Sequence, residues 1–550
     1  MVNYLKKIFS KETNLIILIF FIALFSRFYK LNLYPVSLSM DEVSIGYNAY
    51  SILNTGKDEW GEKLPLAFRS AGDYKPPVNV YLTVPSIYLF GLNEWGVRFP
   101  TAFFGALSVP LLILLLKEIG FKKAGFMGGG FWLSVSPWHV HFSRGGFEAV
   151  TALFFLLLGT LLFFKSIKLK SYLYFQLSSL SFILSIWSYH AERLFVPLLM
   201  AFLVFYNWSK VKFVFNNRSK LFLVVFVSLV LFLPFIYITF FTDAVRERAL
   251  STSILREQSL IKELNFGSYD NFKDLIFDND IYVILRHFMG KYFNYFDLKF
   301  WFWKGMHFTP SEFLDSGLFY MADMLFIIVG IYFLFKSKNN VLKGLSLFWF
   351  FAGPIPAAYA MNEQHALRAL TWLPFFGLAY AAGFEYFNNM KNSAKIFFGY
   401  FLFLLLNLVL VSDIYFRQFP RFHADAWQYG YKEIALYACN DQEKYDKVYV
   451  TDTFGSIVPN NTGLPAEYIL FYCKIDPDEF VYNNRKFDRI VIKRWQAKNK
   501  DIPDNSLVIG SYWDLLSEDI YKGKVIKTIN YPSGKPAFLF LDTRREINEI

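Results

Sequence analysis

The chain has 550 residues, of which 55% are hydrophobic and 21% aromatic, and its formal net charge is +11. Ordinary soluble domains are about 45–50% apolar, and here the excess forms runs that approach the roughly 20 residues of a spanning helix, which excludes an ordinary soluble domain. Many Lys and Arg residues lie in short connectors between these runs; membrane orientation explains that charge, and we expect no nucleic-acid partner.

The first apolar run covers residues 13–29 and follows Lys6, Lys7 and Lys11, a pattern that also begins secretory signals. No small-residue cleavage site follows it, because the run continues into Ser26-Arg27-Phe28-Tyr29. We therefore predict an uncleaved first spanning helix.

Residues 30–96 form the predicted first outer loop, and they contain two adjacent carboxylates, Asp41 and Glu42. Such a pair close to a lipid boundary is costly unless the protein uses it. The apolar run 77–91 in the same loop is short and contains Pro85. We expect it to be an interfacial or re-entrant helix on the outer face.

Charge asymmetry orients the remaining runs. The N-terminus and five short connectors are rich in Lys and Arg, and the positive-inside rule places them in the cytoplasm. The segment 242–317 holds slightly more acids than bases and is predicted to be a long outer loop. We predict an α-helical polytopic membrane protein in the cell membrane, with about eleven spanning helices and a cytoplasmic N-terminus. The expected spans lie near 13–29, 97–116, 124–140, 147–165, 171–188, 193–208, 220–241, 318–335, 344–360, 368–386 and 396–414.

Residues 415–550 are more polar and differ from the transmembrane domain expected over residues 1–414. Short strand-like runs at 447–452, 489–494, 506–512 and 536–542, with a helical pattern at 426–438, predict a small α/β extracytoplasmic domain. We find in it no Gly-rich phosphate loop and no metal-binding spacing, so a structural or substrate-handling cap is the expectation. Cys439 and Cys473, the two cysteines of the chain, either pair in an exported domain or remain ordinary thiols.

The connectors predicted to face outward carry His, Glu and Arg, whereas the inner ones carry mostly Lys. Charges at helix ends are often merely solvated, but these lie on the same side as Asp41 and Glu42. Their gathering predicts a cavity at the membrane interface for a phosphate-bearing lipid. The residues are Arg144 and Glu148, His190 and Arg193, and His365 and Arg368, in three separate connectors, together with Tyr74 and Lys75 of the first loop.

These features resemble the GT-C superfamily of membrane glycosyltransferases, specifically its protein O-mannosyltransferase and aminoarabinose-transferase branch. The resemblance covers roughly residues 13–386 and rests on Asp41-Glu42, GKDEWG, DYKPP, FGLNEWGVRFP, SRGGFE and SYHAER, in this order. It implies a polyprenyl-phosphate-linked sugar donor and a lipid, glycan or protein acceptor on the outer face. It also implies that Asp41 is the first-loop aspartate, Glu148 the second acid and Lys75 the donor-phosphate lysine.

The chemistry of such a transfer agrees with these residue types. Displacing a polyprenyl phosphate from a sugar needs a carboxylate that accepts the acceptor's proton and cations that stabilise the departing phosphate. We expect Asp41 to be the base, with Glu42 orienting it, and inversion at the sugar carbon. Lys75, Arg144, Arg193 and Arg368 are the phosphate candidates, and Tyr74, His190 and His365 line the substrate. We expect no cofactor and no required metal, although Asp41 with Glu148 could hold a divalent cation.

Two other classes of function stay open from the sequence. Charges in the membrane also mark the path of a transporter or flippase for a lipid-linked saccharide, but the polar residues here gather on one face. A non-catalytic scaffold that presents the C-terminal domain would not need the acidic pair of the first loop.

Overall fold

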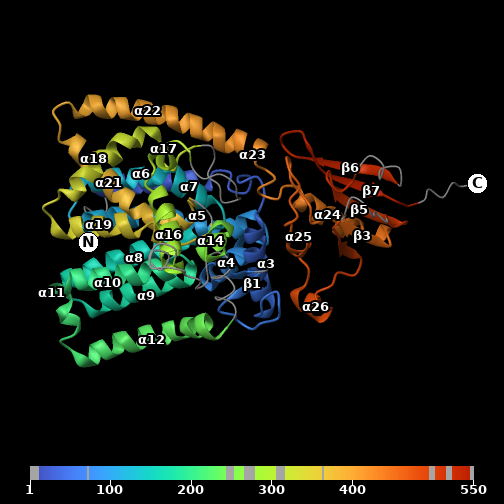
Figure 1. Cartoon of the computed structure of the whole chain (residues 1–550), viewed down its shortest axis with the longest axis horizontal. Coiled ribbons are helices and arrows are strands. Elements are labelled where there is room, and N and C mark those ends of the chain that lie inside the picture. The colour runs from blue at the N-terminus through green and yellow to red at the C-terminus, as the bar shows by residue number, and fades with distance from the viewer. Residues whose placement is uncertain are drawn as a thin grey trace, which may run out of the picture. The chain divides into compact units, whose positions relative to one another are not determined.

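The structure is a computed structural model and describes residues 11–70, 73–242, 253–264, 279–304, 316–361, 364–494, 502–515 and 523–544 (Figure 1). The chain forms two compact units. The first comprises residues 1–29, 72–78 and 101–411, and the second comprises 30–71, 79–100 and 412–550. The second unit therefore joins most of the first loop to the C-terminal region, an association that the sequence did not reveal.

The first unit is helical, and each of the eleven apolar segments predicted to span contains a helix. Its helices are α2 (Lys11–Phe28), α6 (Lys123–Val135), α7 (Pro137–Arg144), α8 (Glu148–Leu169), α9 (Tyr172–Ser188), α10 (Glu192–Tyr206), α11 (Trp208–Val211), α12 (Arg218–Phe241), α14 (Gln258–Glu263), α16 (Asp280–Asn294), α17 (Leu298–Phe302), α18 (Met324–Phe335), α19 (Asn340–Ala352), α20 (Ile355–Ala358) and α21 (Leu373–Asn388). Two further helices, α5 (Glu94–Glu118) and α22 (Ser393–Asp413), have residues in both units.

Helix length decides which of these elements can cross a membrane. Within the described ranges, five helices are long and apolar enough, or six if the bent pair 192–206 and 208–214, with its 83° bend, forms one span. Helix α6 has 13 residues and ends before Pro137, which begins α7, so the expected span 124–140 is broken there. At about 1.5 Å per residue, 13 residues cover less than the roughly 30 Å hydrocarbon core. The chain is a multi-pass membrane protein, and the count of eleven spans stays a prediction.

Small residues bring two helices of the first unit into close contact. A Cβ atom on Gly330 of α18 would lie 1.7 Å from the Ala379 carbonyl oxygen of α21, and one on Gly383 would lie 2.0 Å from the Phe326 oxygen. Glycine at both positions lets the two backbones touch, as is common between membrane helices.

The second unit contains a five-stranded mixed sheet, and this confirms the α/β domain expected at the C-terminus. The strand order is β4-β3-β5-β7-β6. Strands β4, β3 and β5 are parallel to one another, and β7 is antiparallel to both of its neighbours, β5 and β6. Strand β6 was not expected from the sequence. The elements are α3 (Met40–Thr55), β1 (Phe68–Ser70), most of α4 (Pro77–Phe90), α23 (Phe419–Phe422), α24 (Tyr431–Asp441), β3 (Lys447–Val450), α25 (Pro465–Tyr472), α26 (Pro477–Tyr482), β4 (Ile490–Ile492), β5 (Ser506–Ser511), β6 (Lys524–Asn530) and β7 (Pro536–Asp542), while β2 (Asp73–Lys75) lies mainly in the first unit.

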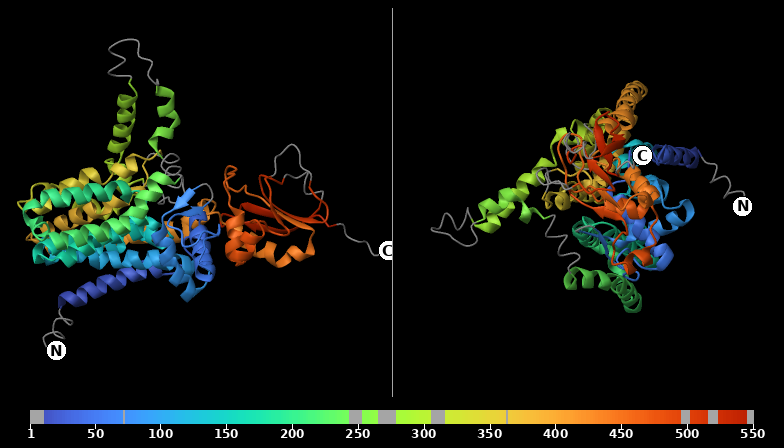
Figure 2. Two further views of the ribbon diagram at one scale, coloured as in Figure 1. Left: turned by 90° about the horizontal axis from the view of Figure 1, so that it is seen from below. Right: turned by 90° about the vertical axis from the view of Figure 1, so that its right-hand side faces the viewer.

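Alternation along the strands builds two cores of unequal size. Leu507 and Ile509 of β5 belong to a large core that includes residues of α3, α24 and α25, whereas Val508 between them belongs to a small core with Leu515 and Leu541. Neighbouring strand residues point to opposite faces, so the helices cover one face, as the left view of Figure 2 shows. Cys439 of α24 and Cys473, just after α25, form a disulfide, which settles the alternative that the sequence left open.

Candidate functional site

The acidic pair lies at the N-terminus of helix α3, which a capping box begins. The Ser39 backbone N–H donates to Glu42 Oε2 over 2.8 Å, and the Glu42 N–H donates in return to Ser39 Oγ over 3.4 Å. This exchange satisfies two backbone donors that the first turn of a helix leaves without intrahelical partners. Glu42 is therefore part of the architecture of the turn that presents Asp41.

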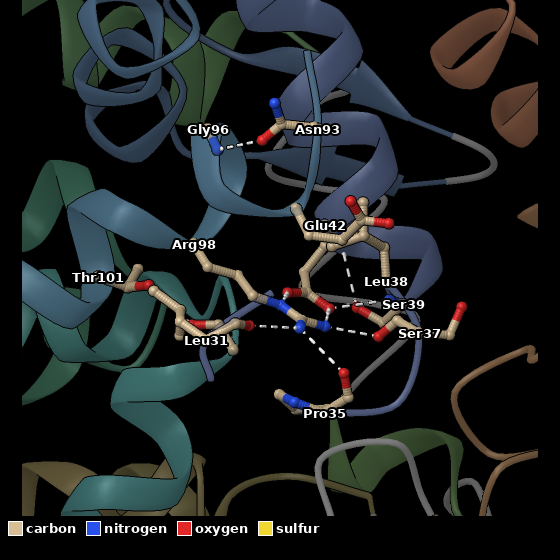
Figure 3. Close-up of polar contacts among 12 residues, drawn as sticks. Leu31, Pro35, Ser37, Leu38, Ser39, Glu42, Asn93, Gly96, Arg98 and Thr101 are labelled. Atoms are coloured by element: carbon tan, nitrogen blue, oxygen red, sulfur yellow. Dashed lines mark hydrogen bonds and ion pairs between the residues drawn. The ribbon is translucent and has the colours of Figure 1, made fainter. Parts of the chain in front are cut away.

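Arg98 of helix α5 completes the environment of Glu42 (Figure 3). Its Nε donates to Glu42 Oε1 over 2.7 Å, and both side chains are buried. The other nitrogens donate to the backbone carbonyls of Leu31, Pro35 and Ser37. One guanidinium thus ties residues 31–37 to the start of α3, in the planar geometry that suits arginine.

The two adjacent carboxylates therefore have different surroundings. Glu42 is 1% exposed and bonded to Ser39 and Arg98, whereas Asp41 is exposed. The Glu42 carboxylate is therefore occupied by structural contacts, while its exposed neighbour Asp41 lies on the same capped turn. Of the two expected catalytic residues in the first loop, Asp41 is the exposed one, and its role as the base stays a prediction.

The C-terminal region contributes to the same turn through helix α25. The fully buried Tyr468 hydroxyl donates to the Leu38 carbonyl oxygen over 2.7 Å. Burial raises the pKa of Tyr468 well above its usual range, and the nearby charges of Glu42 and Asp41 raise it further. Tyr468 therefore stays neutral at physiological pH and donates a hydrogen bond to Leu38, which lies three residues before Asp41.

A second polar cluster joins the first loop to the C-terminal region around Glu59 of the GKDEWG motif. Glu59 Oε1 accepts a hydrogen bond from Asn48 Nδ2 over 3.1 Å, and Arg485 stacks on Trp60 with its Cζ 3.5 Å from the ring centre. Glu59 is almost fully buried. Burial raises its pKa well above the usual range, and Glu467 adds to the rise while Arg485 opposes it.

In the first unit, the DYKPP segment contacts the SYHAER segment. His190 Nε2 lies 3.2 Å from the Tyr74 carbonyl oxygen, so two of the expected substrate-binding residues meet. Lys75 follows directly and is only 6% exposed. A buried ammonium group is rare unless it is paired or serves a ligand.

His365 and Arg368 form a neighbouring pair in the first unit. The Arg368 backbone N–H donates to His365 Nδ1 over 3.5 Å, and the His365 N–H donates to the Tyr295 hydroxyl over 2.9 Å. Burial raises the pKa of Tyr295 above its usual range, and the guanidinium of Arg368 opposes that rise. Tyr189, which precedes His190, also acts on Tyr295, so the two expected connectors lie within electrostatic reach of each other.

The remaining expected residues have visible structural roles. Arg144 Nη1 donates to the carbonyls of Ser26 and Arg27 over 3.1 Å each and so binds the end of α2. Glu148 is the first residue of α8, where a negative charge favours the helix dipole. Arg193 of α10 stacks on the Phe235 ring at 5.1 Å.

Asp41 and Glu42 belong to the second unit, and the other expected site residues belong to the first. Their convergence in one cavity stays a prediction. In the part of the chain that the structure describes, no three His, Cys, Asp or Glu side chains are grouped to hold a metal ion.

Arg98 and Tyr468 are site residues that the sequence analysis missed. The Ser39–Glu42 spacing is a visible capping-box signature, and Arg98 is an isolated charge in an apolar helical run, which points to a buried partner. Tyr468 carried no such signal, because its contact with Leu38 joins positions 430 residues apart.

Comparisons with known proteins agree with this architecture. Residues 74–238 match the family model of dolichyl-phosphate-mannose-protein mannosyltransferase. The structure of ArnT from Cupriavidus metallidurans in the apo state is 12% identical, with a TM-score of 0.52 over 97% of this chain and 99% of ArnT. The same protein bound to undecaprenyl phosphate gives 12% identity and a TM-score of 0.50 over 96% and 97%. No curated protein sequence matches the chain. At such identity the likeness establishes the fold, and the expected fold is confirmed.

Proposed function

We propose that the chain is a membrane glycosyltransferase of the GT-C kind, which transfers a sugar from a polyprenyl phosphate to an acceptor outside the cytoplasm. The fold is that of ArnT, whose structure contains undecaprenyl phosphate. The observation that carries the proposal is the exposed Asp41 beside the buried Glu42–Arg98 pair.

In the proposed reaction, the Asp41 carboxylate takes the proton of the acceptor hydroxyl. The acceptor oxygen forms a bond to the anomeric carbon while the bond from that carbon to the phosphate oxygen breaks. The electron pair leaves with the phosphate, and attack from the opposite face inverts the carbon. Fixing Asp41 on a capped helix turn favours the reaction, because the base is held in place before the substrate arrives.

Lys75, Arg144, Arg193 and Arg368 are the groups that we propose for the donor phosphate. Lys75 is buried and is the last residue of β2, directly before Pro76. Proline restricts the backbone of the residue that precedes it, so the ammonium group projects from a stiff segment. His190, which contacts the carbonyl oxygen of the preceding Tyr74, would line the sugar together with Tyr74. Positive charge at these positions stabilises the departing phosphate without a metal.

The C-terminal region lies on the same side of the membrane as Asp41 in this proposal. The Cys439–Cys473 disulfide supports an extracytoplasmic location, because disulfides persist in oxidising compartments. The acceptor, whether lipid, glycan or protein, then approaches from outside the cytoplasm.

Mass spectrometry of lipid extracts tests the proposal. Cells that produce the parent chain, the Asp41→Asn variant or neither are compared for polyprenyl-phosphate sugars and glycosylated products. We expect the parent to lower one donor pool and to raise one product, and the Asn variant to match cells that lack the protein. A change in the leaflet that holds the donor, without any glycosylated product, would instead identify a transporter.

A further inference from the structure

The C-terminal region carries a loop, residues 455–459, that exposes aliphatic side chains. Ile457 is 71% exposed and Val458 66% exposed, and Pro459 beside them is also exposed. Exposing adjacent aliphatic side chains to water is unfavourable, and an exposed apolar patch commonly marks contact with a membrane or a partner. We call residues 455–459 the aliphatic loop.

The aliphatic loop is rigidly built. Phe454 and Asn460 close it with two backbone hydrogen bonds of 2.9 and 2.7 Å. Trp513 Nε1 donates to the Gly455 carbonyl over 2.8 Å, and the Gly455 N–H donates to the Tyr531 hydroxyl over 3.1 Å. Gly455 has φ +122°, a conformation that side chains rarely adopt. The exposure of Ile457 and Val458 is therefore held in place by the surrounding structure.

One residue fixes the loop close to the end of a membrane helix. Asp425 Oδ2 accepts hydrogen bonds from the Ser456 N–H over 2.9 Å and from the Ser456 hydroxyl over 2.6 Å. Asp425 is three residues after Phe422, the last residue of the 30-residue apolar helical stretch Ser393–Phe422. Three residues of chain reach at most about 10 Å, so the aliphatic loop lies close to the C-terminal end of this helical stretch, a few turns beyond the expected span 396–414.

The groups around this point suit a lipid surface. Arg417 and Arg421 are exposed on the last turns before Asp425, and Arg417 pairs with Asp413 over 2.8 Å. Phe422, which follows Arg421, is 57% exposed. Lys535 Nζ lies 3.5 Å from the Ser456 carbonyl oxygen. Basic groups beside apolar tips are the combination that binds an anionic membrane interface.

We propose that the aliphatic loop is a membrane anchor, which inserts Ile457 and Val458 into the interface of the leaflet on the side of the C-terminal region. Arg421 and Lys535 then meet lipid phosphates. The anchor holds the C-terminal region against the bilayer, and it does not depend on the transferase chemistry.

Depth-dependent fluorescence quenching on the full-length protein tests the anchor. Ile457→Cys and, separately, Val458→Cys are labelled with an environment-sensitive nitrobenzoxadiazole dye; the two native cysteines form a disulfide and leave the new thiol as the reactive one. The protein is reconstituted in vesicles of phosphatidylcholine and phosphatidylglycerol that contain headgroup-nitroxide lipid. We expect both dyes to emit at shorter wavelength and to be quenched several-fold more than a control dye.

The control is Asp504→Cys, an exposed position just before β5. Since β3 and β5 are parallel, position 504 lies at the end of the sheet opposite to the loop that follows β3. Equal quenching at positions 457, 458 and 504 would overturn the anchor. A second result would also overturn the anchor. If the nitroxide lipid does not quench the dyes, but the same cysteines are shielded from a membrane-impermeant thiol reagent in native membranes, the loop contacts a protein partner instead.

Discussion

Arg98 Nε lies 2.7 Å from Glu42 Oε1, and neither side chain reaches solvent. The pair joins helix α5 to the first turn of α3, one residue from the exposed Asp41. A buried ion pair adds little net stability, but removing one partner leaves an uncompensated charge and commonly costs about 3–5 kcal/mol. The pair therefore fixes the turn that carries Asp41, the residue that we propose as the base.

This division predicts opposite behaviour for the two adjacent carboxylates. Arg98→Met should lower the melting temperature strongly, because Glu42 would remain buried without its cation. Asp41→Asn should leave the melting temperature nearly unchanged and abolish transfer. Thermal unfolding of the purified proteins in detergent measures the first effect, with the exposed Glu62→Gln as a control of the same loop. A stable, fully active Arg98→Met protein would contradict the claim that the Glu42–Arg98 pair fixes the turn.

Lys75 is expected to act on the donor. Lys75→Ala should raise the donor concentration needed for half-maximal transfer, and Lys75→Arg should recover part of the loss because charge survives while geometry changes. Lys63→Ala, an exposed lysine of the same loop, serves as the control. Transfer rates across a donor titration at matched protein levels measure the effect. Unchanged kinetics for Lys75→Ala would assign this lysine to packing alone.

Tyr468 is expected to position the turn rather than to touch substrate. Tyr468→Phe removes the hydrogen bond to Leu38, whose net stabilisation is about 0.5–1.5 kcal/mol. We expect kcat to fall and the donor KM to change little, because the base is held less firmly. Tyr472→Phe is a matched control on the same helix, since its hydroxyl donates to Glu94 instead. If both variants lower kcat equally, Tyr468 acts through general stability.

The raised pKa of Glu59 predicts that the stability of the protein depends on pH. Its pKa in the folded state is raised well above its ordinary value of 4.5, chiefly by burial. Between that value and the folded pKa, the folded state binds more protons than the unfolded state, so stability falls as pH rises through this window. Glu59→Gln should weaken that fall and should raise the melting temperature at neutral pH. Melting curves of both proteins from pH 4 upward measure it, and parallel curves would contradict the raised pKa.

The sequence predicted the helices well, because apolar runs and Lys-rich connectors follow directly from the bilayer as solvent. It predicted four strands of the C-terminal sheet but not β6, whose Lys524–Asn530 segment places polar residues within the run. The pairing of α3 with α25 could not be predicted, because residues such as Leu38 and Tyr468 meet only through the fold. The different surroundings of Asp41 and Glu42 were missed for the same reason, although the capping box was visible.

The most direct measurement is the release of undecaprenyl phosphate from synthetic undecaprenyl-phosphate sugars by the purified, reconstituted protein. The assay contains an extract of lipids and glycans from the producing cells as acceptor, and compares the parent with Asp41→Asn. We expect release with at least one donor sugar, and a rate about 10²–10⁴-fold lower for the folded Asn variant. Equal release by the two proteins would contradict the assignment of Asp41, and no release from any donor in the set would contradict the transferase itself.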